Sequence, residues 1–153
     1  MVFSQTKEVS FEELMPVIRD RLANGISVWI YPKGVSMLPM IRQGIDRVLL
    51  SPLPDKLRKY DLPFYQRDNG QFVLHRIVGV GETYTCVGDN QIDLEAGVRC
   101  DQMIAIVTAF TRGDKEISAS SLPYKAYCRY CHYFRGARHL WRRGIGWLRR
   151  HLK

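Results

Sequence analysis

The sequence predicts a mainly β fold, a sandwich or barrel, with a short helix before it and a basic helical tail after it. Short runs rich in β-branched and aromatic residues recur along the chain, and turn residues (glycine, proline, asparagine, aspartate) separate them. Apolar residues make up 46% of the 153 residues, which is enough for a buried core. The predicted strands are 26–31, 46–50, 62–67, 71–80, 83–87 and 103–110.

The first predicted element is an amphipathic helix over residues 10–24. Ser10 can cap its first turn, Glu13 completes a capping box, and Gly25 is a natural end. The apolar face that we expect to pack against the strands carries Phe11, Leu14, Ile18 and Leu22.

The connections between strands have recognisable patterns. Residues 68–70 (Asp-Asn-Gly) favour a tight hairpin, because asparagine and glycine accept positive φ. We expect a short helical turn at 40–44, a polar loop at 91–101 and another turn at 112–115.

The formal net charge of +8 is unevenly distributed. Residues 125–153 hold nine lysines and arginines and no acid, whereas residues 1–124 hold 14 basic and 15 acidic residues. A tail of this composition favours an anionic partner, either lipid or nucleic acid.

The tail has two helical patterns. Tyrosines recur every three residues after Pro123, at 124, 127, 130 and 133. Beyond Gly136, one helix face carries Trp141, Ile145, Leu148 and Leu152, and basic residues fill much of the rest. We favour an anionic membrane surface bound through residues 136–153. The alternative is a helix that packs its apolar face on the domain. Nucleic-acid binding ranks third, because no recognised nucleic-acid module accompanies the arginines.

We expect three parts: an N-terminal helix (1–25), a β domain (26–120) and the aromatic-rich basic tail (121–153). No run of about 18 apolar residues predicts a transmembrane helix, and the N-terminus has no signal-peptide pattern. These features predict a cytoplasmic protein, peripheral at a membrane if its tail docks there.

The four cysteines are expected to be free thiols. Cys128 and Cys131 form a C-x-x-C with His132 adjacent, which is a weak signal for zinc or redox chemistry. We interpret them as two thiols on a helix and expect neither a metal nor a cofactor.

Ser36 is the candidate nucleophile. It follows the strand-like run 28–31, with Gly34 two residues before it and Pro39 three after it. This pattern favours a fixed turn. A serine hydroxyl needs a neighbouring base and backbone N–H donors for a developing oxyanion before it reacts at neutral pH.

Among the four histidines, His75 is the candidate base. His132, His139 and His151 lie in the basic tail, where no acid could orient them. His75 lies in an apolar-rich strand, where a polar ring must find a partner or face a cleft. Taken alone, a strand histidine is more often a structural residue than a catalyst.

Three blocks in order resemble the type I signal peptidases: GVSMLP (34–39), VLHRIVGV (73–80) and VGDN (87–90). YDLPF (60–64) stands where that family has a similar strand entry. The family belongs to a superfamily that includes the self-cleaving SOS repressors. The resemblance spans 28 to about 110 and implies a signal-peptidase-like β barrel or sandwich.

The resemblance also implies site residues. Ser36 would be the nucleophile and would use its own backbone N–H for part of the oxyanion hole. His75 stands where most bacterial members have lysine, as in the endoplasmic-reticulum type. Asp89 matches an acid of the family, and a second acid is implied shortly after it, where both Asp93 and Glu95 stand.

We therefore expect a serine endopeptidase that cleaves a leader or partner peptide through a Ser36/His75 dyad oriented by Asp89. Signal peptidases normally carry an N-terminal membrane anchor, which this sequence does not show. The alternatives are a non-catalytic peptide-binding β domain held at an anionic membrane by its tail, and a nucleic-acid-associated regulator.

Overall fold

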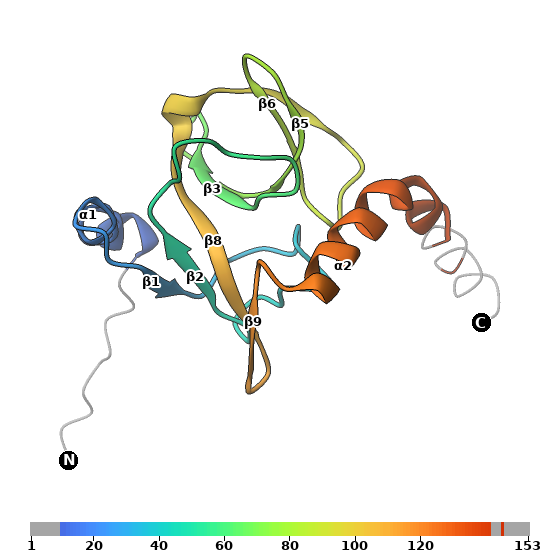
Figure 1. Cartoon of the computed structure of the whole chain (residues 1–153), viewed down its shortest axis with the longest axis horizontal. Helices are drawn as coiled ribbons and strands as arrows, with labels where there is room; N and C mark the ends of the chain where they lie inside the picture. The colour runs from blue at the N-terminus through green and yellow to red at the C-terminus, as the bar shows by residue number, and fades with distance from the viewer. Residues whose placement is uncertain (1–9, 142–144, 146–153) are drawn as a thin grey trace.

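The computed structural model describes residues 10–141 and residue 145, and its architecture is mainly β with antiparallel sheets (Figure 1). One sheet has the order β1-β2-β8-β3-β4, with β9 paired to β8, and the other has the order β5-β6-β7. The larger sheet ends at β1 and β4, so its described strands do not close into a barrel. The strands are β1 (Val28–Ile30), β2 (Val48–Ser51), β3 (Pro63–Gln66), β4 (Phe72–Leu74), β5 (Arg76–Val80), β6 (Tyr84–Val87), β7 (Glu95–Val98), β8 (Met103–Arg112) and β9 (Lys115–Ser118).

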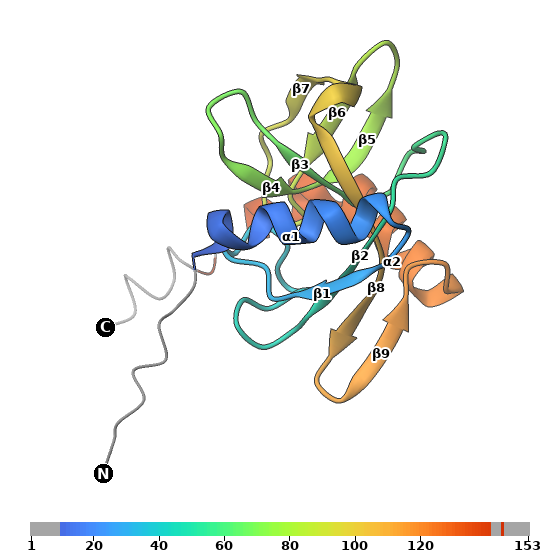
Figure 2. The same cartoon turned by 90° about the vertical axis from the view of Figure 1, so that its left-hand side faces the viewer.

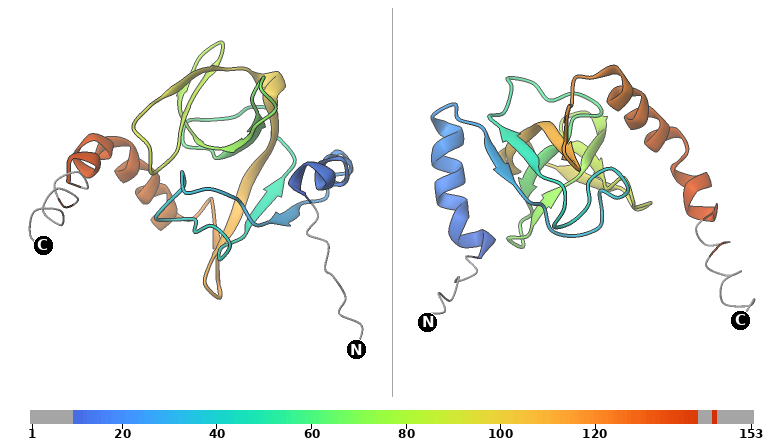
Figure 3. Two further views of the ribbon diagram at one scale, coloured as in Figure 1. Left: turned by 180° about the vertical axis from the view of Figure 1, so that it is seen from behind. Right: turned by 90° about the horizontal axis from the view of Figure 1, so that it is seen from below.

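The N-terminal helix is confirmed as α1 (Phe11–Ala23), with the Ser10–Glu13 capping box in place. Its packing face differs from the predicted one. Leu14 is 43% exposed, and Met15 is buried in its place. The buried stripe therefore runs through Met15, Ile18 and Leu22, with Phe11 partly buried against the same core. Figure 2 shows α1 lying across the larger sheet. The right-hand view of Figure 3 shows α1 and α2 on opposite sides of the strands.

The 68–70 hairpin is confirmed, and the strand predicted after it is divided. β3 and β4 pair with Phe64 opposite Leu74, and Gly70 has a φ of +86° in the turn. The prediction of one strand over 71–80 is wrong, because β4 and β5 belong to different sheets. The chain changes partners at His75: the Ile77 N–H donates to the Asp61 carbonyl (2.9 Å) instead of continuing the ladder with β3.

Three other connections differ in whole or in part from the prediction. The segment 91–101, predicted as a polar loop, contains β7 and begins the 3₁₀ turn Cys100–Gln102. The predicted turn at 112–115 is confirmed at Gly113, but it leads into β9, which was not predicted. The predicted helical turn at 40–44 is a pair of non-helical turns.

The tail begins with α2 (Leu122–Tyr133). Phe134 ends α2 with a φ of −99° and a ψ of 14°, and a further helical segment follows over residues 135–141. The Arg138 N–H donates to the Phe134 carbonyl (2.9 Å) across this join. Its buried face consists of Tyr124, Cys128 and Cys131, and of the predicted tyrosine stripe only Tyr124 is buried. Leu148 and Leu152 lie outside the described residues.

Both helices contribute to one hydrophobic core. Met15 and Ile18 of α1 belong to the same buried cluster as Tyr124 and Cys128 of α2. The predicted boundaries at 25/26 and 120/121 therefore separate segments of sequence that share this core. In the part of the chain that the structure describes, no helix is both long and apolar enough to cross a membrane.

Candidate active site

Ser36 lies in a turn that the core and a neighbouring loop hold in place. Met37 and Ile41 after it are buried. Gly34 before it has a φ of +92°, a conformation that suits glycine, and its N–H donates to Gln43 Oε1 (3.1 Å). The hydroxyl-bearing residue is thus fixed by the residues on either side of it.

An ion pair between the buried Asp46 and the half-buried Arg42 secures the far end of the same loop. Asp46 accepts hydrogen bonds from the Arg42 backbone N–H (2.9 Å) and from Arg42 Nε and Nη2 (both 2.8 Å). The Gly113 N–H adds a fourth bond (3.2 Å). The Arg42 guanidinium holds the pKa of Asp46 at about 2, so the carboxylate stays charged near neutral pH.

The Gly88–Asn90 block packs directly on the serine turn. The Asn90 N–H donates to the Ser36 carbonyl (2.8 Å), and Asn90 Nδ2 donates to the Val35 carbonyl (3.0 Å). A Cβ on Gly88 would lie 2.7 Å from the Ser36 carbonyl oxygen. The glycine is therefore required by this close approach.

His75 occupies the crossover between β4 and β5 and is only 5% exposed. Its Nδ1 lies 3.5 Å from Glu95 Oε2 and 3.4 Å from the Tyr65 hydroxyl. Because Nδ1 has these partners, Nε2 is the ring nitrogen left to exchange a proton with a substrate or nucleophile. The tautomer with its proton on Nδ1 fits this arrangement.

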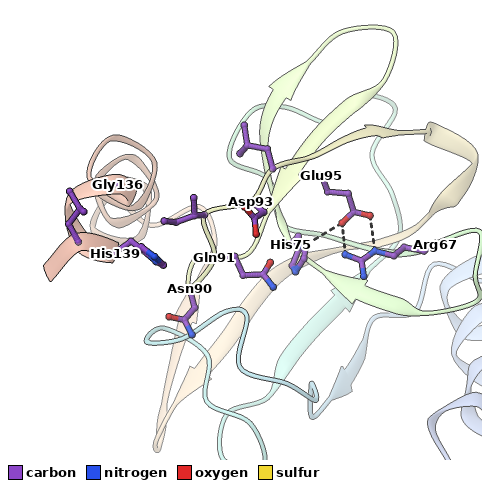
Figure 4. A pocket seen from close by; sticks show the side chains of 11 residues that line it. Arg67, His75, Asn90, Gln91, Asp93, Glu95, Gly136 and His139 are labelled. Carbon is purple, nitrogen blue, oxygen red and sulfur yellow. Dashed lines mark hydrogen bonds and ion pairs between the residues drawn. The ribbon is translucent and has the colours of Figure 1, made fainter. Parts of the chain in front are cut away.

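Glu95 is itself held by Tyr65 of β3 and by Arg67, which directly follows that strand. Arg67 binds it through two parallel bonds, Nε to Oε1 (2.7 Å) and Nη2 to Oε2 (2.6 Å), and the Tyr65 hydroxyl donates to Oε2 (2.7 Å). Figure 4 shows Glu95 joined to both His75 and Arg67. The hydrogen bonds from Arg67 lower the pKa of Glu95, which keeps it an anion beside the ring.

The environment of His75 favours the neutral ring. Burial lowers the pKa of His75 below its ordinary value, the charge of Glu95 partly opposes this, and the charge of Arg67 adds to it. A neutral imidazole near pH 7 is the form that can accept a proton.

Ser36 and His75 line one cavity of about 280 Å³, together with Gly34 and Gln91. No hydrogen bond joins Ser36 to His75 among the described residues, and in ligand-free structures such bonds are often long. A second cavity of about 210 Å³ continues from it past Lys33. Its lining is largely apolar, with Phe11, Ile30, Tyr31, Phe64, Phe72 and Leu74.

Asp89 is placed differently from the expectation that it orients His75. Both of its carboxylate oxygens bind Arg76, from Nε (2.8 Å) and Nη2 (2.7 Å), and both residues are buried. Arg76 Nη1 also donates to the Tyr124 hydroxyl (3.0 Å) and lies 2.9 Å from Cys128 Sγ. Asp89, through Arg76, therefore ties the 88–90 loop to α2, and Glu95 takes the position beside the imidazole.

The other residues singled out in the sequence do not join the serine. Asp93 lines a larger cavity of about 1030 Å³ with His75 and Glu95, without a hydrogen bond to His75 in the described chain. Cys128 and Cys131 are buried free thiols, and no group of histidines, cysteines and acids among residues 10–141 could hold a metal ion. His132 packs against Tyr60, and His151 lies outside the described residues.

Sequence reasoning missed Tyr65 and Arg67. Tyr65 lies in β3 and Arg67 directly follows its last residue, Gln66. Residues two apart along an extended chain share a side, and this spacing is the signal that could have linked them. Searches of known proteins place the chain in no family: no family model, no curated protein and no solved structure matches it.

Proposed function

We propose that the chain is a serine endopeptidase of signal-peptidase type, built on a variant of that family's β fold. The observation that carries the proposal is the shared cavity: Ser36 and His75, distant in sequence, line it together. Glu95 beside the ring supplies the third group of a nucleophile, base and orienting acid.

In the proposed reaction the Ser36 hydroxyl oxygen attacks the carbonyl carbon of the scissile peptide bond. His75 Nε2 takes the hydroxyl proton, and the Glu95 carboxylate stabilises the imidazolium that forms. The Ser36 N–H makes no hydrogen bond among the described residues, so it is available to the oxyanion.

Collapse of the tetrahedral intermediate breaks the C–N bond and gives the proton from His75 to the leaving amine. The acyl group remains as an ester on Ser36. A water molecule then attacks the ester, His75 accepts its proton, and the returning proton releases Ser36 and the new carboxyl end of the substrate.

The adjoining apolar cavity suits side chains of an extended substrate. Its aromatic lining, which includes Phe64 and Phe72, would bury apolar side chains on one side of the scissile bond. The same cavity is compatible with a domain that binds a peptide without cleaving it. Turnover separates the two functions.

The test is cleavage of a mixed peptide library, read by mass spectrometry. Ser36→Ala and His75→Ala should each lower turnover by about 10⁴-fold or more, because the groups act as a unit. The matched control is Ser120→Ala, since Ser120 is exposed and its hydroxyl bonds the Ser118 hydroxyl, away from the cavity. Cleavage that persists undiminished in Ser36→Ala would refute the proposal, and so would a wild-type protein that binds peptides from the library without cleaving them.

A further inference from the structure

The helix that continues from α2 leaves an apolar stripe uncovered. Tyr130, Phe134, Trp141 and Ile145 recur at spacings of four, seven and four, which places them on one face of a helix. Their exposed fractions range from 41% to 72%. The rings of Tyr130 and Phe134 lie 5.3 Å apart, so the stripe begins as a contiguous aromatic surface.

This exposure argues against the interpretation in which the tail packs its apolar face on the domain. The face of α2 that meets the core carries Tyr124, Cys128 and Cys131, which is a different set of positions. Trp141 is 72% exposed. The stripe, which runs from α2 into the helical segment 135–141, and the core-facing side of α2 are therefore separate surfaces.

The surroundings of the stripe are basic. The exposed Arg129 precedes Tyr130, and its guanidinium lies 5.8 Å from the centre of the Tyr60 ring. The Arg138 guanidinium lies 5.8 Å from the centre of the Tyr130 ring and donates to the Asp89 carbonyl (2.6 Å). The sequence from 121 to 153 carries nine basic residues and no acid. A second copy of this chain would bring like charge against like charge, so an anionic occupant fits better.

A row of exposed aromatic and aliphatic side chains with arginines beside it matches the interface of an anionic bilayer. Phosphate headgroups pair with the arginines, and tryptophan, phenylalanine and isoleucine enter the boundary with the acyl chains. Nucleic acid would use the arginines but would leave the apolar stripe in water.

Further exposed apolar side chains lie at the large cavity, on the other side of the tail from the stripe. Ile92 and Leu94 are exposed, and with Leu140 of the tail they line the 1030 Å³ cavity that also contains His75. Figure 4 shows Gly136 and His139 on the tail side of this cavity, across from the 90–93 segment.

We propose that the C-terminal helix docks the chain on the surface of an anionic phospholipid bilayer through Tyr130, Phe134, Trp141 and Ile145. Gly136, His139 and Leu140, which line the large cavity with His75, lie on the opposite side of this helical segment from Trp141 and Ile145. The docking does not depend on the proposed peptidase function.

The experiment is co-sedimentation of the full chain with vesicles, carried out on Ser36→Ala protein so that peptidase activity cannot affect it. Binding is expected to vesicles of phosphatidylcholine with phosphatidylglycerol and not to phosphatidylcholine alone. It should weaken as salt rises. Trp141→Ala with Ile145→Ala should weaken binding by about tenfold or more, although the charge is unchanged.

Two matched variants isolate the stripe. Ile145→Ala alone should weaken vesicle binding, and Ile45→Ala, the same change at an exposed position outside the tail, should not. Equal binding by the wild type and the Trp141/Ile145 variant would overturn the proposal, as would failure to bind the anionic vesicles. Tighter binding to duplex DNA than to those vesicles would also overturn it, in favour of a nucleic-acid partner.

Discussion

His75 combines two roles at one residue: it joins the two sheets and it faces Ser36 across a cavity. A histidine inside a regular strand would have neighbours set by the ladder. Here the ladder of β4 ends at Leu74 and that of β5 begins at Arg76, so the ring between them meets the Tyr65–Arg67–Glu95 network instead. The chain's change of partner is what places the imidazole beside the Glu95 carboxylate.

The first residue-scale prediction concerns Glu95→Gln. In the proposed reaction His75 accepts a proton, so it acts when neutral. The value of kcat/KM should therefore rise with pH through the pKa of His75 and level off above it. This rising limb of the profile should lie below pH 6.5, because burial lowers the pKa of His75. Glu95 opposes the lowering. Its neutralisation should therefore shift the limb to still lower pH, and the plateau rate should fall by about 10²–10⁴-fold as the imidazolium loses its partner.

The measurement is a pH profile of kcat/KM for wild type, Glu95→Gln and Asp93→Asn. Asp93 is the control because it stands on the same segment without a hydrogen bond to His75 among the described residues. A limb that moves in Asp93→Asn and stays fixed in Glu95→Gln would assign the acid to Asp93.

The second residue-scale prediction is that Gly88→Ala displaces Ser36. The added Cβ would lie 2.7 Å from the Ser36 carbonyl oxygen and 2.9 Å from Ser36 Cβ, so the serine turn must shift. A shift of this kind should lower turnover by about 10²-fold. Gly81→Ala is the control, since its Cβ meets its nearest neighbour at an ordinary 3.7 Å. Unchanged turnover in Gly88→Ala would contradict this prediction, because it would show that the serine turn can shift without lowering the reactivity of Ser36.

At the scale of elements, Arg76 and Asp89 connect β5, the 88–90 loop and α2. The Asp89 carbonyl also accepts from Arg138 Nη2 (2.6 Å) in the tail helix. The guanidinium and carboxylate are almost entirely buried, so each depends on the other for its hydrogen bonds. The pair thus places the loop that touches Ser36 and fixes α2 against the sheets.

Asp89→Ala should accordingly act first on stability. It leaves the Arg76 charge buried without a partner, which should lower the free energy of unfolding by about 3–5 kcal/mol, measured by urea denaturation. The double variant Arg76→Met/Asp89→Leu should recover much of that loss, because it removes both charges. A single Asp89→Ala variant that keeps wild-type stability would show that water solvates Arg76 in its place.

At the scale of the whole molecule, part of this arrangement was readable from local sequence. Helix α1 was predictable from its capping box and apolar spacing, and β8 from its long apolar run. β7 was not, because Val98 is its one buried position and gives no alternation of apolar and polar residues. The division at His75 was also hidden, since apolar residues continue on both sides of it.

The candidate site was predictable to a similar extent. Ser36 and His75 could be proposed because each lies within a short recognisable block. The partner of Asp89 could not be predicted. Arg76 reaches Asp89 because the chain passes from one sheet to the other at His75, and the sequence does not show this change. The choice between Asp93 and Glu95 needed the positions of Tyr65 and Arg67, which come from a different hairpin.

The shared core makes a final prediction about how the chain unfolds. Ile18 of α1 is buried in the cluster that also contains Tyr124 of α2, so the three sequence segments should lose their structure together. Ile18→Ala should lower the free energy of unfolding by about 2–5 kcal/mol. Val17→Ala, one position away and 55% exposed, should change it by less than about 0.5 kcal/mol. Circular dichroism at helical and aromatic wavelengths should follow one coincident transition in each variant, because helix and core melt as one unit. Loss of helical signal before loss of aromatic signal in Ile18→Ala would instead show α1 to be an independent element on a β domain that is stable without it.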